Sequence, residues 1–120
     1  MELQKAIIMF DALSQETRLR AFRLLVRAGH EGLAAGVLSE QLGTPHNTLS
    51  FHLTHLSNAG CVTSRKEGRL VIYTANFDSI HELLGFMVKD CCSADVASIR
   101  EDKKKCCSVI EIAHCCDPKK

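Results

Sequence analysis

Adjacent cysteines are the residues of this chain best suited to chemistry. They form three pairs, all within the last thirty residues: Cys91-Cys92, Cys106-Cys107 and Cys115-Cys116. The ninety residues before them contain a single cysteine, Cys61. Exposed thiols oxidise readily, and soft thiolates select soft metal ions. This concentration of cysteine therefore indicates a soft-metal site or a redox site in the C-terminal segment.

Length and composition limit the kind of protein that carries these thiols. A chain of 120 residues suits one hydrophobic core, so we expect one domain over residues 1–92 and a flexible, Cys-rich extension over residues 93–120. Apolar residues make up 46% and aromatic residues 5%, which favours a small helical domain. The sequence shows no signal peptide and no membrane-spanning stretch, so we expect a cytoplasmic protein. Thiols stay free in that compartment, and the odd total of seven cysteines disfavours a disulfide framework.

Two helices are predicted at the start of the chain. Residues 3–13 carry apolar side chains on more than one side, which indicates a helix that buries two faces. Ser14 is suited to be the N-cap of the next helix, whose apolar residues keep the helical period until Gly29.

A helix-turn-helix pattern follows. Residues 33–42 predict a short third helix that Gly43 ends. Thr44 as N-cap and Pro45 as first helical residue then predict a fourth helix that ends near Gly60. Two short helices joined in this way are typical of DNA-binding domains.

The apolar period changes to two after the fourth helix. Residues 62–66 and 69–74 therefore predict a two-stranded hairpin that turns at Glu67-Gly68. Asp78 is suited to cap a fifth helix. The predicted fold is mainly α with a small β-hairpin, in the order α-α-α-α-β-β-α, which is the winged helix-turn-helix plan.

Polar side chains occupy the outward positions at the start of the fourth helix, where a recognition helix reaches base edges. The predicted DNA-binding residues are His46, Asn47, Thr48, Ser50 and His52 on the helix, with Arg65, Lys66 and Arg69 of the hairpin against phosphates. Each could instead belong to a solvated face or to a hairpin tip that prevents aggregation, and His52 could hold helices together. The order of the elements favours DNA binding, although the net charge is only +1.

These motifs resemble the ArsR/SmtB family of winged-helix metalloregulators. The resemblance covers residues 5 to about 90 and is carried by Asp11-Ala12-Leu13-Ser14, Thr17-Arg18-Leu19, Thr48-Leu49-Ser50-Phe51-His52-Leu53-Thr54-His55-Leu56, Ala59-Gly60, and Ser64-Arg65-Lys66-Glu67-Gly68-Arg69 with Tyr73. It implies a homodimeric repressor that metal ions release from double-stranded operator DNA. It also implies base or phosphate contacts for Thr48, Ser50 and His52, and a dimer interface formed by residues 3–13 and 78–91. Two-fold symmetry then predicts a pseudo-palindromic operator.

The cysteine pairs are most similar to those of arsenite-responsive family members with a vicinal pair at the end of the last helix. The resemblance implies As(III) or Sb(III) as the inducer, held by three thiolates in a pyramid. Cys91 and Cys92 are the first two predicted ligands, and either Cys106 or Cys107 is the third, from the same chain or from the partner chain. Cys115 and Cys116 are auxiliary.

Other readings of the site stay open. The stretch of residues 33–38 has no cysteine, so the arsenite site that some family members carry on the third helix is absent. Zinc-sensing members carry Asp and His pairs on the last helix; Asp78 and His81 lie near those positions, but the distal His pair is missing. Cd(II), Pb(II) or Zn(II) remain alternative inducers, and a thiol-based redox-sensing repressor is an alternative function. We expect no enzyme, because the core has no Gly-rich or Cys-Arg loop for an oxyanion.

Overall fold

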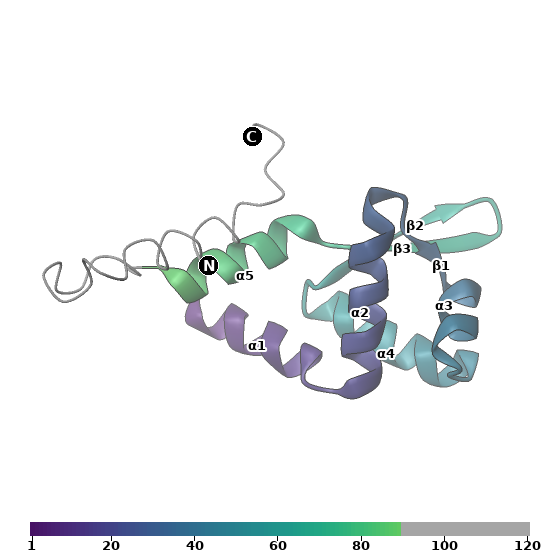
Figure 1. Ribbon diagram of the computed structural model, residues 1–120, viewed down its shortest axis with the longest axis horizontal. Helices are drawn as coiled ribbons and strands as arrows, with labels where there is room; N and C mark the ends of the chain where they lie inside the picture. The colour runs from purple at the N-terminus through teal and green to yellow at the C-terminus, as the bar shows by residue number, and fades with distance from the viewer. Residues whose placement is uncertain (90–120) are drawn as a thin grey trace, which may run out of the picture. The chain divides into compact units, whose positions relative to one another are not determined.

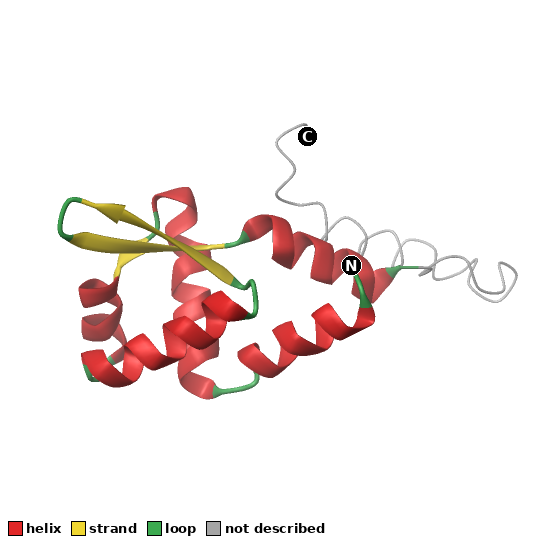
Figure 2. Ribbon diagram, turned by 180° about the vertical axis from the view of Figure 1, so that it is seen from behind, coloured by secondary structure: helices red, strands yellow, loops and turns green. Residues whose placement is uncertain are grey.

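The computed structural model describes residues 1–89 (Figures 1 and 2). Its elements, in chain order, are α1 (Leu3–Leu13), α2 (Glu16–Ala28), the 3-10 helix η1 (Gly29–Glu31), β1 (Leu33–Ala34), α3 (Ala35–Leu42), α4 (His46–Asn58), β2 (Val62–Glu67), β3 (Leu70–Ala75) and α5 (Phe77–Val88). Residues 2–79 form one compact unit, and residues 80–89 belong to a second unit. The predicted boundary at 92/93 lies outside the described residues. No helix within residues 1–89 is long and apolar enough to cross a membrane.

The predicted winged helix-turn-helix architecture is confirmed, with one strand added. The sheet has the order β1-β3-β2 and is antiparallel throughout. Leu33 pairs with Tyr73 and Ala34 with Ile72, so the prediction that Leu33 begins the third helix was wrong. A strand of two residues is too short to show the apolar alternation that predicts a strand, and β1 is a strand only because it pairs with β3.

The wing is the hairpin of β2 and β3, which projects from the body on the same side as α3 (Figures 1 and 2). Val62 pairs with Ala75 at its base and Glu67 with Leu70 at its tip. The turn residues are therefore Gly68 and Arg69, one position later than predicted, and Gly68 has a positive φ of 62°. A cross-strand bond of 2.9 Å joins the hydroxyls of Thr63 and Thr74.

Three helix starts differ from the predicted caps. The N-cap of α2 is Gln15, whose Oε1 accepts from the backbone N–H of Arg18 at 2.9 Å, whereas Ser14 closes α1 by donating to the carbonyl of Asp11. Only Ser14 and Gln15 separate the two helices, so Ser14 is the C-cap of α1 and Gln15 is the N-cap of α2.

The starts of α4 and α5 are also shifted. Pro45 is the N-cap of α4, in an extended conformation, so Thr44 lies in the turn and His46 is the first helical residue. Before α5, Oδ1 of Asn76 accepts from the N–H of Ser79 at 3.2 Å, while Asp78 lies within the first helical turn. The start of α4 is one position later than predicted, and the capping side chain before α5 is two positions earlier.

The core of residues 2–79 lies between the helices and the sheet. Its fully buried large side chains are Met9, Leu25, Leu38, Leu49, Leu53, Leu56, Cys61 and Val62. On α1 the buried stripe is Ala6, Met9 and Ala12, whereas Leu3, Ile7, Ile8 and Phe10 are exposed. The alanines at two of the three buried positions let α1 approach its neighbours closely, and most of its larger apolar side chains other than Met9 are exposed.

Cys61 is a buried core residue. It is 0% exposed, and its Sγ lies 4.0 Å from the carbonyl oxygen of Met9. Burial raises the pKa of the Cys61 thiol to about 11. Because the thiolate is both the nucleophile and the metal ligand, this cysteine is unsuited to either role at neutral pH.

Candidate nucleic-acid interface

The turn between α3 and α4 sets the direction of the candidate recognition helix. Gly43 ends α3 in the left-handed conformation, with φ 62° and ψ 29°. The N–H of Thr44 donates to the carbonyl of Ser39 at 3.2 Å, and the Ser39 hydroxyl donates to the Thr44 carbonyl at 2.6 Å. This reciprocal pair fixes α4 relative to α3, because both bonds span the turn.

The two faces of α4 differ sharply. Leu49, Leu53 and Leu56 are buried, which fixes the rotation of the helix about its axis. The predicted residues His46, Asn47, Thr48 and Ser50 are all exposed. Among residues 1–89 no side chain caps the start of α4, so within this part of the chain the first backbone N–H groups are free to bind an anion such as a DNA phosphate.

A hollow lies between the start of α4 and the wing. It has a volume of about 240 Å³ and is lined by Ala34, Ala35, Gly36, His46, Ser50, Arg69, Leu70, Val71 and Tyr73. Three predicted DNA-binding residues therefore meet there, namely His46, Ser50 and Arg69. A guanidinium beside hydroxyl and imidazole groups is suited to hydrogen-bond a phosphodiester group.

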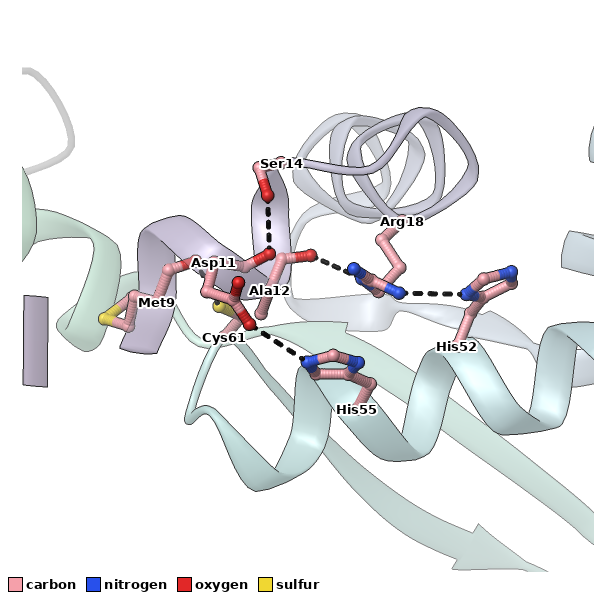
Figure 3. A network of polar contacts seen from close by, with 8 residues as sticks. All are labelled: Met9, Asp11, Ala12, Ser14, Arg18, His52, His55 and Cys61. Carbon is pink, nitrogen blue, oxygen red and sulfur yellow. Dashed lines mark hydrogen bonds and ion pairs between the residues drawn. The ribbon is translucent and has the colours of Figure 1, made fainter. Parts of the chain in front are cut away.

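His52 occupies a different environment from the other predicted residues of α4. Its Nδ1 lies 3.3 Å from Nη1 of Arg18, whose Nε donates to the carbonyl of Ala12 at 2.6 Å (Figure 3). Since arginine can only donate, Nδ1 of His52 accepts and its neutral ring carries the proton on Nε2. Arg18 thus ties the end of α1 to α4, and the Nε2–H of His52 stays available as a donor.

A second histidine lies on the same edge of α4. Nε2 of His55 is 3.7 Å from Oδ2 of Asp11, which is at the end of α1 (Figure 3). Both side chains are solvent-accessible, so this contact contributes little to stability. Together with the Arg18 contact it lies on the side of α4 that faces α1 and α2.

The predicted wing residues divide into two kinds. Arg65 donates from Nη2 to the carbonyl of Glu31 at 2.8 Å and from Nη1 to the carbonyl of His30 at 3.3 Å. Its guanidinium therefore holds β2 against η1, and a DNA contact by Arg65 stays a prediction. Lys66 and Arg69 are exposed, and no ion pair to either is formed among residues 1–89.

Sequence reasoning missed three residues of this surface. Arg18 positions His52, Tyr73 lines the hollow, and Phe51 of α4 is 71% exposed. All three belong to the motifs of the family resemblance. A role for Phe51 could have been suspected from its place two residues after the inward Leu49, whereas the contact of Arg18 depends on folding.

The titration of His52 gives a testable dependence of stability on pH. Burial, then the neighbouring charges of Arg18 and His55, lower the pKa of His52 below its ordinary value of 6.5. The unfolded chain therefore takes up this proton more readily than the folded chain. Neutral His52 stabilises the fold fully above about pH 6.5, and this contribution is lost as the pH falls toward the folded-state pKa.

We expect the free energy of unfolding, measured with urea, to decrease as the pH is lowered from about 8 to about 5. His52→Asn keeps an acceptor for Arg18 but removes the titration, so its stability should fall less over the same range. An equal fall in the variant and the wild type would contradict this assignment.

Comparison with known proteins identifies the family. A helix-turn-helix domain family matches residues 13–65. The transcriptional activator HlyU of Vibrio cholerae is 30% identical over 91 residues, which cover 76% of this chain and 82% of that protein. This chain belongs to the ArsR family of winged helix-turn-helix transcriptional regulators.

Solved structures of ArsR-type regulators share the fold. HlyU from Vibrio cholerae has a TM-score of 0.58 at 33% identity, and the match covers 72% of this chain and 97% of that one. Its reduced form has a TM-score of 0.56 at 32% identity, and the match covers 70% of this chain and 88% of that one. An ArsR-like regulator from Rhodococcus sp. RHA1 has a TM-score of 0.67 at 25% identity over 83% of this chain and 93% of its own. The homodimeric winged helix-turn-helix domain of Mb0332 from Mycobacterium bovis, at 21% identity over 78% and 86%, matches in fold with a TM-score of 0.60.

Proposed function

We propose that this chain is a homodimeric repressor that leaves its operator when arsenite or antimonite is bound by C-terminal cysteine thiolates. The observation that carries the proposal is the succession of three adjacent-cysteine pairs directly after a winged helix-turn-helix domain of the ArsR family. The domain supplies a DNA-binding surface, and the pairs supply soft ligands.

The shape of the α4 surface supports binding to DNA. Exposed hydrogen-bonding side chains at the start of α4 suit base edges in the major groove. The hollow with His46, Ser50 and Arg69 suits the adjoining phosphate, and Lys66 extends the basic surface along the wing. Phosphate contacts would position the domain, while α4 would read the sequence.

Exposed apolar side chains support a dimer. On α1, Leu3 is 65% exposed, and Ile7, Ile8 and Phe10 are each more than 40% exposed. On α5, Leu84 and Met87 are three residues apart and also exposed. Burial of such side chains against a second copy is favourable, so we propose residues 3–13 and 78–91 as the interface. Its two-fold axis would present two α4 helices to successive major grooves, about 34 Å apart.

The proposed inducer ligands lie outside the described residues. They are Cys91, Cys92 and either Cys106 or Cys107, with Cys115 and Cys116 as an auxiliary pair. Within residues 1–89 no group of three or more His, Cys, Asp or Glu side chains could hold a metal ion. The seventh cysteine, Cys61, is buried with a raised pKa, which supports assigning the ligands to the six others.

Ligation of As(III) or Sb(III) by three thiolates would draw the C-terminal segment toward the end of the dimerisation helix. A coupling free energy of about 1–3 kcal/mol between two sites changes affinity by roughly 5- to 150-fold. Recognition helices held one turn of DNA apart tolerate little rotation, so a small change at the interface would suffice for release.

Two alternatives keep the same fold and DNA surface. Cd(II), Pb(II) or Zn(II) could be the inducer, although zinc favours four ligands and commonly a C-x-x-C spacing that the adjacent pairs lack. Alternatively, peroxide could oxidise two vicinal thiols to a disulfide while being reduced to water. One solved structure of HlyU is of its reduced form, which supports the redox alternative. HlyU is a transcriptional activator. That this chain represses transcription is therefore also part of the proposal.

A titration on DNA tests the function. The wild-type protein is bound to a duplex from its own promoter, and arsenite, antimonite, cadmium, lead and zinc are added separately while bound-ion stoichiometry is recorded. We expect one As(III) or Sb(III) per protomer and release from the duplex. Release only by another ion, or only by peroxide in metal-free buffer, would replace the proposed inducer, and failure to form any sequence-specific complex would refute DNA regulation.

A further inference from the structure

Phe51 is the most exposed large apolar side chain within residues 1–89, at 71%. It lies on α4 two residues after the buried Leu49, which places it about 200° further around the helix. Leu53 and Leu56 are buried on the same side as Leu49, so Phe51 points away from the core. The residue therefore lies at the centre of the outward face of α4.

The surroundings of Phe51 are polar. Asn47, Ser50 and Thr54 lie four residues before, one residue before and three residues after it, and all are exposed. Its only ring contact within the described chain is an edge contact with His52, at a centroid distance of 6.2 Å. Single exposed apolar residues are common, but this one is an isolated aromatic ring among hydrogen-bonding groups. A subunit interface usually offers a contiguous apolar cluster instead.

The floor of the DNA major groove has one apolar group to match such a ring, which is the C5-methyl of thymine. We propose that Phe51 reads a thymine in each operator half-site through contact with this methyl group. The inference rests on the proposed DNA-binding function and assigns a base preference to one residue of that surface.

The geometry of α4 limits where the thymine lies. Asn47 and Phe51 are four residues apart and lie on one line along the helix, about 6 Å apart. Successive base pairs are about 3.4 Å apart along a strand. The thymine should therefore lie within about two base pairs of the position that Asn47 contacts.

Uracil provides a test that removes only the methyl group. The wild-type protein is titrated against the operator duplex that it binds and against copies of this duplex in which each thymine in turn is replaced by uracil. Burial of one methyl group contributes about 0.8 kcal/mol, so we expect affinity to fall about fourfold for one substituted half-site and about fifteenfold for both. Positions away from α4 should show no such change.

Protein variants complete a double-mutant cycle. Phe51→Ala should bind the thymine duplex more weakly and lose its dependence on the methyl group, while Phe51→Leu should retain part of it. Val26→Ala, which removes an exposed apolar side chain of α2, is the matched control and should keep the full dependence. Circular dichroism checks that each variant is folded.

Three results would overturn the inference. Uracil could leave wild-type affinity unchanged at every position, or Phe51→Ala could remain as sensitive to uracil as the wild type. Phe51→Ala could also shift the protein to a smaller species in sedimentation, which would assign the ring to a subunit interface. In each case sequence-specific binding by the wild type would leave the proposed function standing, whereas its absence would refute both.

Discussion

Replacement of Cys91 or Cys92 by serine is expected to abolish release by arsenite while operator affinity stays within about twofold of the wild type. Each change removes one of three thiolates, and a hydroxyl is a poor ligand for a soft ion. The DNA-binding surface lies on α4 and the wing, so these substitutions leave it unchanged. Fluorescence anisotropy of a labelled operator, with and without arsenite, measures both quantities.

Other cysteines provide the matched controls for this experiment. Cys115→Ser and Cys116→Ser should respond to arsenite as the wild type does, because that pair is assigned an auxiliary role. Single serine variants of Cys106 and Cys107 should differ from each other, and the unresponsive one identifies the third ligand. Normal release in both the Cys91 and Cys92 variants would refute the proposed site.

Gly32→Ala is expected to cause a large loss of stability. Gly32 has φ 71° and ψ −170°, a conformation that is essentially restricted to glycine. A Cβ there would overlap the backbone carbonyl oxygen of Tyr73 and lie 2.6 Å from Cγ2 of Thr74. Backbone strain of about 1–3 kcal/mol and overpacking of about 1–3 kcal/mol should together lower the free energy of unfolding by roughly 2–6 kcal/mol.

Gly29→Ala separates the two causes. Gly29 has φ 68° and ψ −151°, nearly the same conformation, but a Cβ at this position meets no atom of residues 1–89 within 4 Å. Its loss should therefore be limited to about 1–3 kcal/mol. Urea denaturation followed by circular dichroism measures both variants. Equal losses would show that the close approach of β3 to Gly32 has no energetic consequence.

The sequence predicted the elements of this fold because most of them depend on local patterns. The leucines at positions 49, 53 and 56 repeat with the helical period, and all three are buried. Gly43 was predicted to end α3 and does so in the left-handed conformation. The alternation after Cys61 predicted the wing. A helix or a hairpin turn forms mainly from neighbours in the chain, so its signal is present in a short window.

Predictions were less successful where a residue depends on a distant partner. β1 exists because Leu33 pairs with Tyr73, forty positions along the chain. His52 contacts Arg18 at a separation of 34 residues, and Arg65 bonds to carbonyls 34 and 35 residues away. No local pattern reveals these partners, and for that reason two residues predicted to contact DNA also hold elements together.

Periodicity and residue type are local properties, so the order of the helices, the wing and the polar character of the start of α4 were predictable from the sequence. The family was suggested by the resemblance of several motifs and shown by comparison with relatives. Contacts between distant segments then determine which polar side chains of α4 and the wing remain available to a ligand. His46, Ser50 and Arg69 converge on one hollow, while Arg65 is held by carbonyls of η1. A side chain's availability depends on the hydrogen bonds and burial that such distant segments impose on it, and these form only when the chain folds.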